Sequence, residues 1–299
     1  MKHRPRKPLG KPGARDGRGN PPKSAPREDR GARGDSRRDD RPDRGPRGES
    51  ARPARDKSPR LNIDLFGTHA VQAAWKNPGR FIHTLYITQD ALKDFDLAAP
   101  QKRPAPTVVS KDELDRALPP GTVHQGVALS CQALEESSID DLIRDAEQKD
   151  KSLLLILDQV TDPHNIGAIL RSACAFGANG MVLQRKHAPE VTGVMAKTAC
   201  GALEYVPMAY ETNLSRAIET LQEAGYFVIG LDEHGEKTIA QLPAYDKCAL
   251  VLGAEGPGLR RLIKENCDTL ARLPMKGEMP SINVSNAAAV ALYELAGRE

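Results

Sequence analysis

Residues 152–171 read SLLLILDQVTDPHNIGAILR, and this stretch holds the strongest signal for the fold. It begins with a run of apolar residues from Leu153 to Leu157, which is typical of a strand buried on both faces of a parallel sheet. A polar turn follows, and from Asn165 onward apolar residues recur at helical spacing, among them Ile166 and Ile169. The stretch therefore predicts a strand, a turn and a helix.

The pattern continues toward the C-terminal end. Further strands are predicted over residues 180–183, 226–231, 248–252 and 270–274, and helices over 165–176, 190–203, 214–224, 258–265 and 284–295. Strands that alternate with helices predict a parallel sheet with helices on both faces. We therefore expect an α/β domain over residues 151–299.

The region before this domain has a weaker alternation. Residues 70–75 and 111–118 read as helices, and 82–88 and 124–129 as strands. This predicts a small α/β module over residues 61–131. The charged residues 132–150 predict a linker and a helix capped by Ser138.

The first 60 residues differ in composition from all the others. They hold 20 Lys and Arg against 9 Asp and Glu, and they contain no Val, Ile, Phe, Tyr or Trp, whereas residues 61–299 carry a net charge of −8. Such a segment cannot bury enough apolar surface to offset its chain entropy. We expect a disordered basic arm that tethers RNA weakly; the alternative is a solubilising tail.

Several classes of protein are disfavoured. The five cysteines include no CxxC pair and no metal-ligand spacing, and their odd number favours reduced thiols in a cytoplasmic protein. No apolar run approaches the length of a membrane span. The N-terminus lacks the apolar core of a secretion signal, and nine acidic residues argue against a transit peptide. We expect neither a metal nor a membrane partner.

Three polar loops follow predicted strands, in residues 157–171, 251–259 and 273–285; we call them the first, second and third segments. In open α/β domains, ligands bind beyond the carboxyl ends of the strands, so three such loops predict one composite site. In the first segment, Arg171 lies off the apolar stripe among small residues, and Asn165 opens the helix. Taken alone, Asn165 could be only a helix cap and Arg171 only a surface charge.

The second and third segments add more polar groups. Glu255 lies in the glycine-rich run GAEGPG, which could also be an ordinary tight turn and matches no nucleotide-binding fingerprint. The third segment contains more polar side chains than one helix cap needs, and they could bind the polar edges of a ligand. They are Ser281, Asn283, Ser285 and Asn286.

Taken together, the three segments resemble the three signature motifs of the SPOUT superfamily in its SpoU branch of RNA ribose methyltransferases. The resemblance rests on PHNIGAILRSACAFG at 163–177, VLGAEGPGL at 251–259 and LPMKGEMPSINVSNAAAVALYE at 273–294, in that order. The module containing LFGTHAV and HQGVAL resembles the L30e-like substrate-binding domain of bacterial large-subunit rRNA methyltransferases.

The resemblance implies a fold, a cofactor and an assembly. It implies a C-terminal trefoil knot, although knots are rare in proteins, S-adenosylmethionine bound in that knot, and a homodimer with its active site near the subunit interface. It assigns two sets of residues. The cofactor set is Gly253, Leu273, Met275, Ile282 and Ser285, and the catalytic set is Asn165, Arg171, Glu255, Ser281 and Asn283.

The expected reaction is methyl transfer from S-adenosylmethionine to the ribose 2′-OH of a guanosine in 23S ribosomal RNA. A transfer-RNA ribose methyltransferase and a non-catalytic RNA-binding assembly factor are the alternatives. Arg171 has no lone pair with which to accept the 2′-OH proton. We therefore expect it to clamp the adjacent phosphate, whose oxygen would receive the proton.

Overall fold

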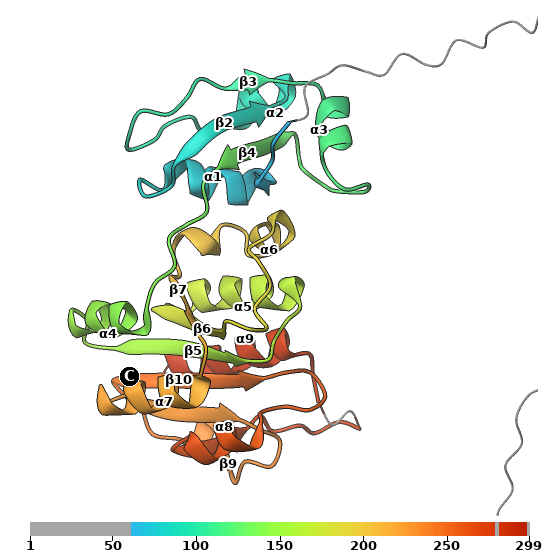
Figure 1. Cartoon of the computed structure of the whole chain (residues 1–299). Coiled ribbons are helices and arrows are strands. Elements are labelled where there is room, and N and C mark those ends of the chain that lie inside the picture. Colours follow the sequence, from blue (N-terminus) through green and yellow to red (C-terminus); the bar gives the residue numbers. More distant parts are fainter. Residues whose placement is uncertain (1–60, 279–280, 298–299) are drawn as a thin grey trace, which may run out of the picture. The chain divides into compact units, whose positions relative to one another are not determined.

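The computed structural model describes residues 61–278 and 281–297. All of them fall within one compact unit that spans residues 57–299. The predicted arm over residues 1–60 lies outside the described residues. The described chain forms two sheets, a small one near its beginning and a large one in its C-terminal part (Figure 1).

The large sheet has seven strands in the order β7-β6-β5-β10-β8-β11-β9, and every neighbouring pair is parallel. The predicted buried strand is β5, and all seven of its residues are buried. The parallel α/β domain is thus confirmed. The strands are β5 (Ser152–Asp158), β6 (Gly180–Gln184), β7 (Met208–Glu211), β8 (Phe227–Leu231), β9 (Lys237–Thr238), β10 (Lys247–Gly253) and β11 (Thr269–Arg272).

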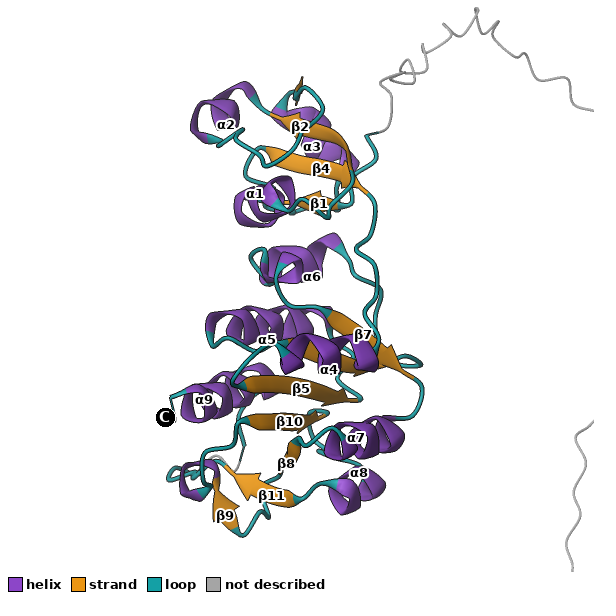
Figure 2. Ribbon diagram, turned by 90° about the vertical axis from the view of Figure 1, so that its left-hand side faces the viewer, coloured by secondary structure: helices purple, strands orange, loops and turns teal. Residues whose placement is uncertain are grey.

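Helices cover both faces of this sheet (Figure 2). Leu155 and Leu157 of β5 face the cluster that includes α5 and α9, whereas Leu154 and Ile156 face the cluster that includes α4, α7 and α8. Alternate side chains of one strand therefore supply two cores. The helices are α4 (Ile139–Glu147), α5 (Pro163–Ala175), α6 (Gly193–Thr198), α7 (Leu214–Glu223), α8 (Arg261–Asn266) and α9 (Val284–Ala296), with short 3-10 helices η1 (Ala202–Glu204) and η2 (Ile239–Gln241).

The small sheet has the order β1-β4-β2-β3 and mixes antiparallel with parallel pairs. The HQG sequence before β4 has a local role. Gln125 adopts a φ of 57° and accepts a hydrogen bond from the backbone N of Thr68 at the start of α1. The elements are β1 (Leu65–Phe66), α1 (Thr68–Lys76), β2 (Ile82–Ile87), α2 (Gln89–Asp94), β3 (Thr107–Val108), α3 (Lys111–Ala117) and β4 (Val127–Cys131).

Two predicted helices are shorter than expected. The helix predicted over 190–203 is α6 alone, because Cys200 and Gly201 have φ values of 51° and 92°, which a helix cannot contain. The helix predicted over 258–265 begins only at Arg261, because Gly258 has a φ of 67° and Arg260 is extended. The predicted helix after the module is α4, and Ser138 caps it as expected.

All five cysteines are free in this structure. Burial raises the pKa of the Cys131 thiol to about 11 and that of Cys267 to about 12, so both stay protonated near neutral pH. Among the described residues, no helix is long and apolar enough to cross a membrane. No group of His, Cys, Asp or Glu in the same part of the chain could hold a metal ion.

Candidate functional site

The second and third segments line one cavity of about 600 Å³ at the carboxyl ends of β8 and β10. We call it the signature cavity. Gly253 ends β10, and Leu273 follows β11 directly. Met275 and Ile282 are 42% and 40% exposed, so the cavity presents uncovered apolar side chains beside polar ones. Of the predicted residues, its lining includes Gly253, Glu255, Leu273, Met275, Ser281, Ile282 and Asn283.

A triangle of hydrogen bonds joins the three segments. The Nδ2 atoms of Asn165 and Asn283 both donate to Oε1 of Glu255, at 3.1 and 2.5 Å. Asn283 Nδ2 also donates to Oδ1 of Asn165, at 3.0 Å. These side chains come from α5, from the loop after β10 and from the start of α9. Residues up to 118 positions apart in the sequence therefore meet at one point.

The helix starts explain this geometry. Asp162 caps α5 through His164 N, and Pro163 occupies its first position, so Asn165 lies in the first turn and is not the cap. The alternative interpretation of Asn165 as only a helix cap is therefore wrong. Asn283 does cap α9, and its Oδ1 accepts hydrogen bonds from the backbone N and Oγ of Ser285, which does not line the cavity.

Arg171 is exposed on α5 and does not line the signature cavity. Its neighbours one turn away are Gly167, Ala168 and Cys174. Among the described residues it has no hydrogen-bond or ion-pair partner. The guanidinium is therefore free to bind a group that is not part of this chain.

The sequence reasoning missed a polar wall of the cavity. Asp232 follows β8, is 9% exposed and pairs with Nζ of Lys264 at 2.6 Å. Burial acts to raise the pKa of Asp232, but the hydrogen bonds from Lys264 and from His234 N outweigh burial and leave that pKa lowered. Both residues line the cavity, together with Glu233 and His234. The sequence did contain a signal for Asp232, Glu233 and His234, because they directly follow a predicted strand, as the three segments do.

A second missed contact ties the first segment to the end of the second. Asp158, fully buried at the end of β5, accepts hydrogen bonds from the backbone N and Nε of Arg260, at 3.0 and 2.7 Å. Gln159 follows with a φ of 60°, a strained value for a residue other than glycine. Asp158 and Arg260 thus hold the chain beyond Gly258 against β5.

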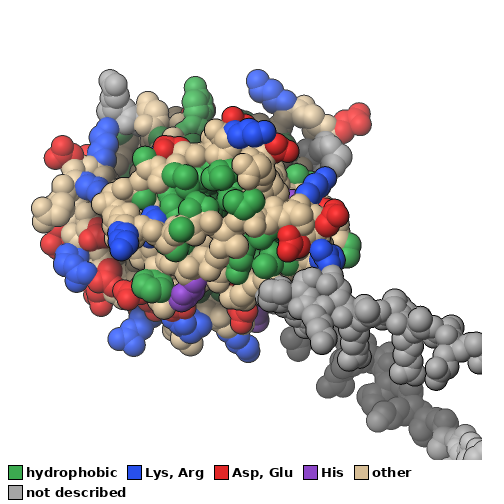
Figure 3. All heavy atoms as spheres, turned by 90° about the horizontal axis from the view of Figure 1, so that it is seen from above, with side chains coloured by type: hydrophobic (Ala, Val, Ile, Leu, Met, Phe, Trp, Pro, Cys, Tyr) green, Lys and Arg blue, Asp and Glu red, His purple; other side chains and the backbone are tan. Residues whose placement is uncertain are grey.

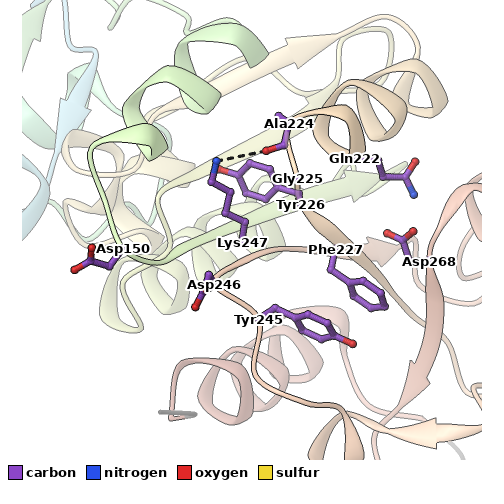
Figure 4. Close-up of a pocket in the computed structure, with 10 residues that line it drawn as sticks. All are labelled: Asp150, Gln222, Ala224, Gly225, Tyr226, Phe227, Tyr245, Asp246, Lys247 and Asp268. Carbon is purple, nitrogen blue, oxygen red and sulfur yellow. Dashed lines mark hydrogen bonds between the residues drawn. The ribbon is translucent and has the colours of Figure 1, made fainter.

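A separate cavity opens at the amino ends of β5, β8 and β10 (Figure 4). There Phe227 and Tyr245 stack with ring centroids 4.1 Å apart. Lys247 Nζ donates to the carbonyl oxygen of Ala224 at 3.4 Å. None of the predicted site residues lines this cavity. It also lies at the edge opposite to the one where open α/β sheets bind ligands.

Glu255 is the shared acceptor of the triangle, so its removal has a testable consequence. We expect Glu255→Ala to lower turnover about 10- to 100-fold, because two amide donors lose their charged acceptor and the loop between Gly253 and Gly258 loses its tie to α5. Glu255→Gln keeps one acceptor oxygen and is the matched control, with a smaller loss. Kinetics of the expected methyl transfer measure both, and full activity of the Ala variant would contradict this role.

Known protein families match the C-terminal α/β domain and the module before it separately. The SpoU rRNA Methylase family matches residues 152–293, and a substrate-binding family of RNA 2′-O ribose methyltransferases matches residues 65–137. The 23S rRNA (guanosine-2′-O-)-methyltransferase RlmB of Coxiella burnetii is 39% identical over 77% of this chain and 94% of its own length. The chain belongs to the SpoU methyltransferase family.

Further relatives are also RNA methyltransferases by name. RlmB of Pseudomonas aeruginosa is 37% identical over 77% of this chain and 94% of its own length. A putative TrmH-family tRNA/rRNA methyltransferase, YacO of Bacillus subtilis, is 42% identical over 58% of this chain and 70% of its own. The fold is also shared with the crystal structure of the SpoU methyltransferase AviRb from Streptomyces viridochromogenes. That structure has a TM-score of 0.63 and 23% identity over 78% of this chain and 88% of AviRb.

Proposed function

We propose that this SpoU protein transfers a methyl group from S-adenosylmethionine to the ribose 2′-OH of a guanosine in 23S ribosomal RNA. One observation carries the proposal: Asn165, Glu255 and Asn283, from three distant segments, are joined by hydrogen bonds at the signature cavity. The two RlmB relatives match this chain over 94% of their own length, and their reaction and substrate support the proposal.

The signature cavity fits S-adenosylmethionine in size and in charge. Its volume of about 600 Å³ lies in the usual range for cofactor sites. Asp232, Glu233 and Glu255 give the lining more acidic than basic side chains, which suits a cationic ligand. Leu273, Met275 and Ile282 would hold its apolar parts. When bound, the cofactor supplies an activated methyl group on a sulfonium.

The chain's own residues would position the acceptor ribose. In-line displacement requires alignment of the acceptor oxygen, the methyl carbon and the sulfur. Glu255, which lines the cavity, and Asn165, which donates to it, would orient the nucleotide, and Ser281 would hold the loop. Arg171 would bind the adjacent phosphate, and an oxygen of that phosphate would receive the 2′-OH proton.

In a homodimer, Arg171 of one subunit would lie at the signature cavity of the other. Arg171 does not line the signature cavity of its own chain, and apolar side chains are exposed on α9, with Val290 45% and Tyr293 66% exposed. Phe176, at the end of α5, contacts Tyr293 edge to face. We expect a dimer by light scattering and a monomer for Tyr293→Asp. A wild-type protein that stays monomeric at micromolar concentration would contradict this arrangement.

The module over residues 61–131 would bind the substrate RNA. Its surface carries exposed apolar side chains such as Val108 and Val123, which are 52% and 60% exposed. Seen from above, hydrophobic side chains gather near the middle of the described surface, and charges of both signs lie around them (Figure 3). On this face the Lys and Arg side chains lie apart from one another, and they would contact the phosphates singly. With a ribosomal RNA substrate, the protein would act in the cytoplasm.

Mapping of 2′-O-methyl groups tests the proposed function. In cells that lack this gene, we expect one guanosine of 23S RNA to lose its methyl group, and purified protein should restore it in the presence of S-adenosylmethionine. Loss of a methyl group from transfer RNA instead would reassign the substrate. An unchanged map, together with no S-adenosylmethionine binding at millimolar concentration, would favour a non-catalytic assembly factor.

A further inference from the structure

A third cavity, of about 400 Å³, opens near the signature cavity and has a different chemistry. Gln184 ends β6, Thr212 follows β7, and Arg260 precedes α8, so this cavity lies at the carboxyl edge of the sheet. Gly258 lines the signature cavity and Arg260 lines this one. Two residues of chain span at most about 7 Å. The two cavities are therefore close enough to bind neighbouring nucleotides of one RNA strand.

The charge of this cavity favours an anion. Its lining includes Arg260 and Arg261 and no Asp or Glu, although residues 61–299 carry a net charge of −8. The carboxylate of Asp158 fixes the guanidinium of Arg260. Among the described residues, Arg261 has Glu265 as its one ion-pair partner, at 2.6 Å, and the two side chains are 77% and 51% exposed. An exposed ion pair of this kind contributes little stability, so a phosphate can replace Glu265 as the partner of Arg261.

Gln184 lines the cavity and carries a buried oxygen that lacks a partner. Among the described residues, Oε1 of Gln184 is the one buried side-chain oxygen or nitrogen without a hydrogen-bond partner. A buried acceptor without a partner is costly, and a phosphate cannot supply the missing donor. A ribose hydroxyl can, once a rotation of the Gln184 side chain turns its amide toward the cavity. Because the hydroxyl both donates and accepts, it suits either orientation of the amide. Thr212 and Ser215 add further hydroxyls at the wall.

We propose that this arginine cavity, lined by Gln184, Thr212, Ser215, Arg260 and Arg261, binds a ribonucleotide of the substrate RNA next to the methylated one, its phosphate on Arg261 and its 2′-OH on Gln184. The inference rests on the proposed function and adds a place where the enzyme contacts its RNA. It also gives the enzyme a means to distinguish RNA from DNA outside the signature cavity.

Arg261→Gln tests the phosphate contact in the full-length protein, with an unmodified 23S transcript as the probe. We expect its KM for the RNA to rise about tenfold, and the slope of log affinity against log salt to fall by about one, as for one lost phosphate contact. Its kcat at saturating RNA and its affinity for S-adenosylmethionine should stay within about twofold. Arg144→Gln is the matched control, because Arg144 pairs with Asp141 within α4 and lies away from the cavity.

Gln184→Met tests the hydroxyl contact. Because Oε1 has no partner in the free protein, we expect the substitution to leave the melting temperature unchanged or higher, yet to weaken RNA binding about fivefold and leave binding of a DNA copy of the same sequence unchanged. A purely structural Gln184 would lose stability instead, which would overturn its role. Unchanged RNA affinity and salt slope in Arg261→Gln would overturn the cavity alone, whereas failure of the wild-type protein to methylate any RNA would overturn the proposed function.

Discussion

Replacement of Arg171 by Ala will lower methyl transfer by at least about 1000-fold while the affinity for S-adenosylmethionine changes less than about twofold. Arg171 is exposed, does not line the signature cavity and has no partner among the described residues, so its loss removes no contact that shapes the cofactor site. It does remove the charge expected to hold the phosphate beside the acceptor ribose, and charge-positioning groups of this kind contribute about 10³-fold or more. Single-turnover assays and calorimetry measure the two effects separately.

Arg171→Lys separates charge from geometry. A lysine keeps the positive charge but lacks the planar fork that binds two phosphate oxygens at once, so we expect it to recover little of the lost rate. The melting temperature should not change in either variant, because the side chain is exposed on α5. Near-normal turnover of Arg171→Ala would remove Arg171 from the mechanism, as clamp or as proton acceptor.

Replacement of Gly253 by Ala will abolish S-adenosylmethionine binding and destabilise the fold by about 3 kcal/mol or more. A Cβ atom at Gly253 would lie inside the backbone of Gly258 and Leu259, far closer than van der Waals contact. Backbone atoms cannot rotate away as a side chain can, so β10 or the loop after it must shift. That loop supplies Glu255 and the wall of the signature cavity. Thermal unfolding and calorimetry with S-adenosylmethionine measure both effects.

Gly277→Ala is the matched control, because a Cβ atom there would meet no atom within 4 Å. We expect it to keep the stability and the cofactor affinity of the wild-type protein. The proposed role of Gly253 would fail if Gly253→Ala bound S-adenosylmethionine normally and melted at the wild-type temperature. Equal damage in both variants would show only that this part of the chain tolerates no change at glycine.

Much of the fold could be predicted from local patterns. The run from Leu153 to Leu157 predicted a strand buried on both faces, and β5 is such a strand. Two edge strands of the large sheet, β7 and β9, were missed. β9 has only two residues, too few for a periodic pattern, and β7 is mostly half-buried, so its sequence shows no run of apolar residues. The trefoil knot stays a prediction of the family resemblance.

The candidate site was predicted in part. Residue type and position drew attention to Glu255 and to the polar residues of the third segment, and the family resemblance assigned Glu255 and Asn283 to the catalytic set. Asn283 also caps α9. The same rule was not applied to the residues after β8, and so it missed Asp232 and its partner Lys264. Ser285 was expected at the cofactor, but it bonds to Asn283 and does not line the cavity.

The amino-acid sequence by itself determined most of the longer strands and helices, which strand is buried on both faces, and which polar residues follow several strands, because burial and backbone conformation leave a local periodicity. Only the tertiary structure decided that Asp158 holds Arg260, 102 positions away, that Asn165 meets Glu255, and that Arg171 does not line the signature cavity. Such contacts depend on the order of strands in the sheet, which places β10 between β5 and β8, and no local pattern records that order.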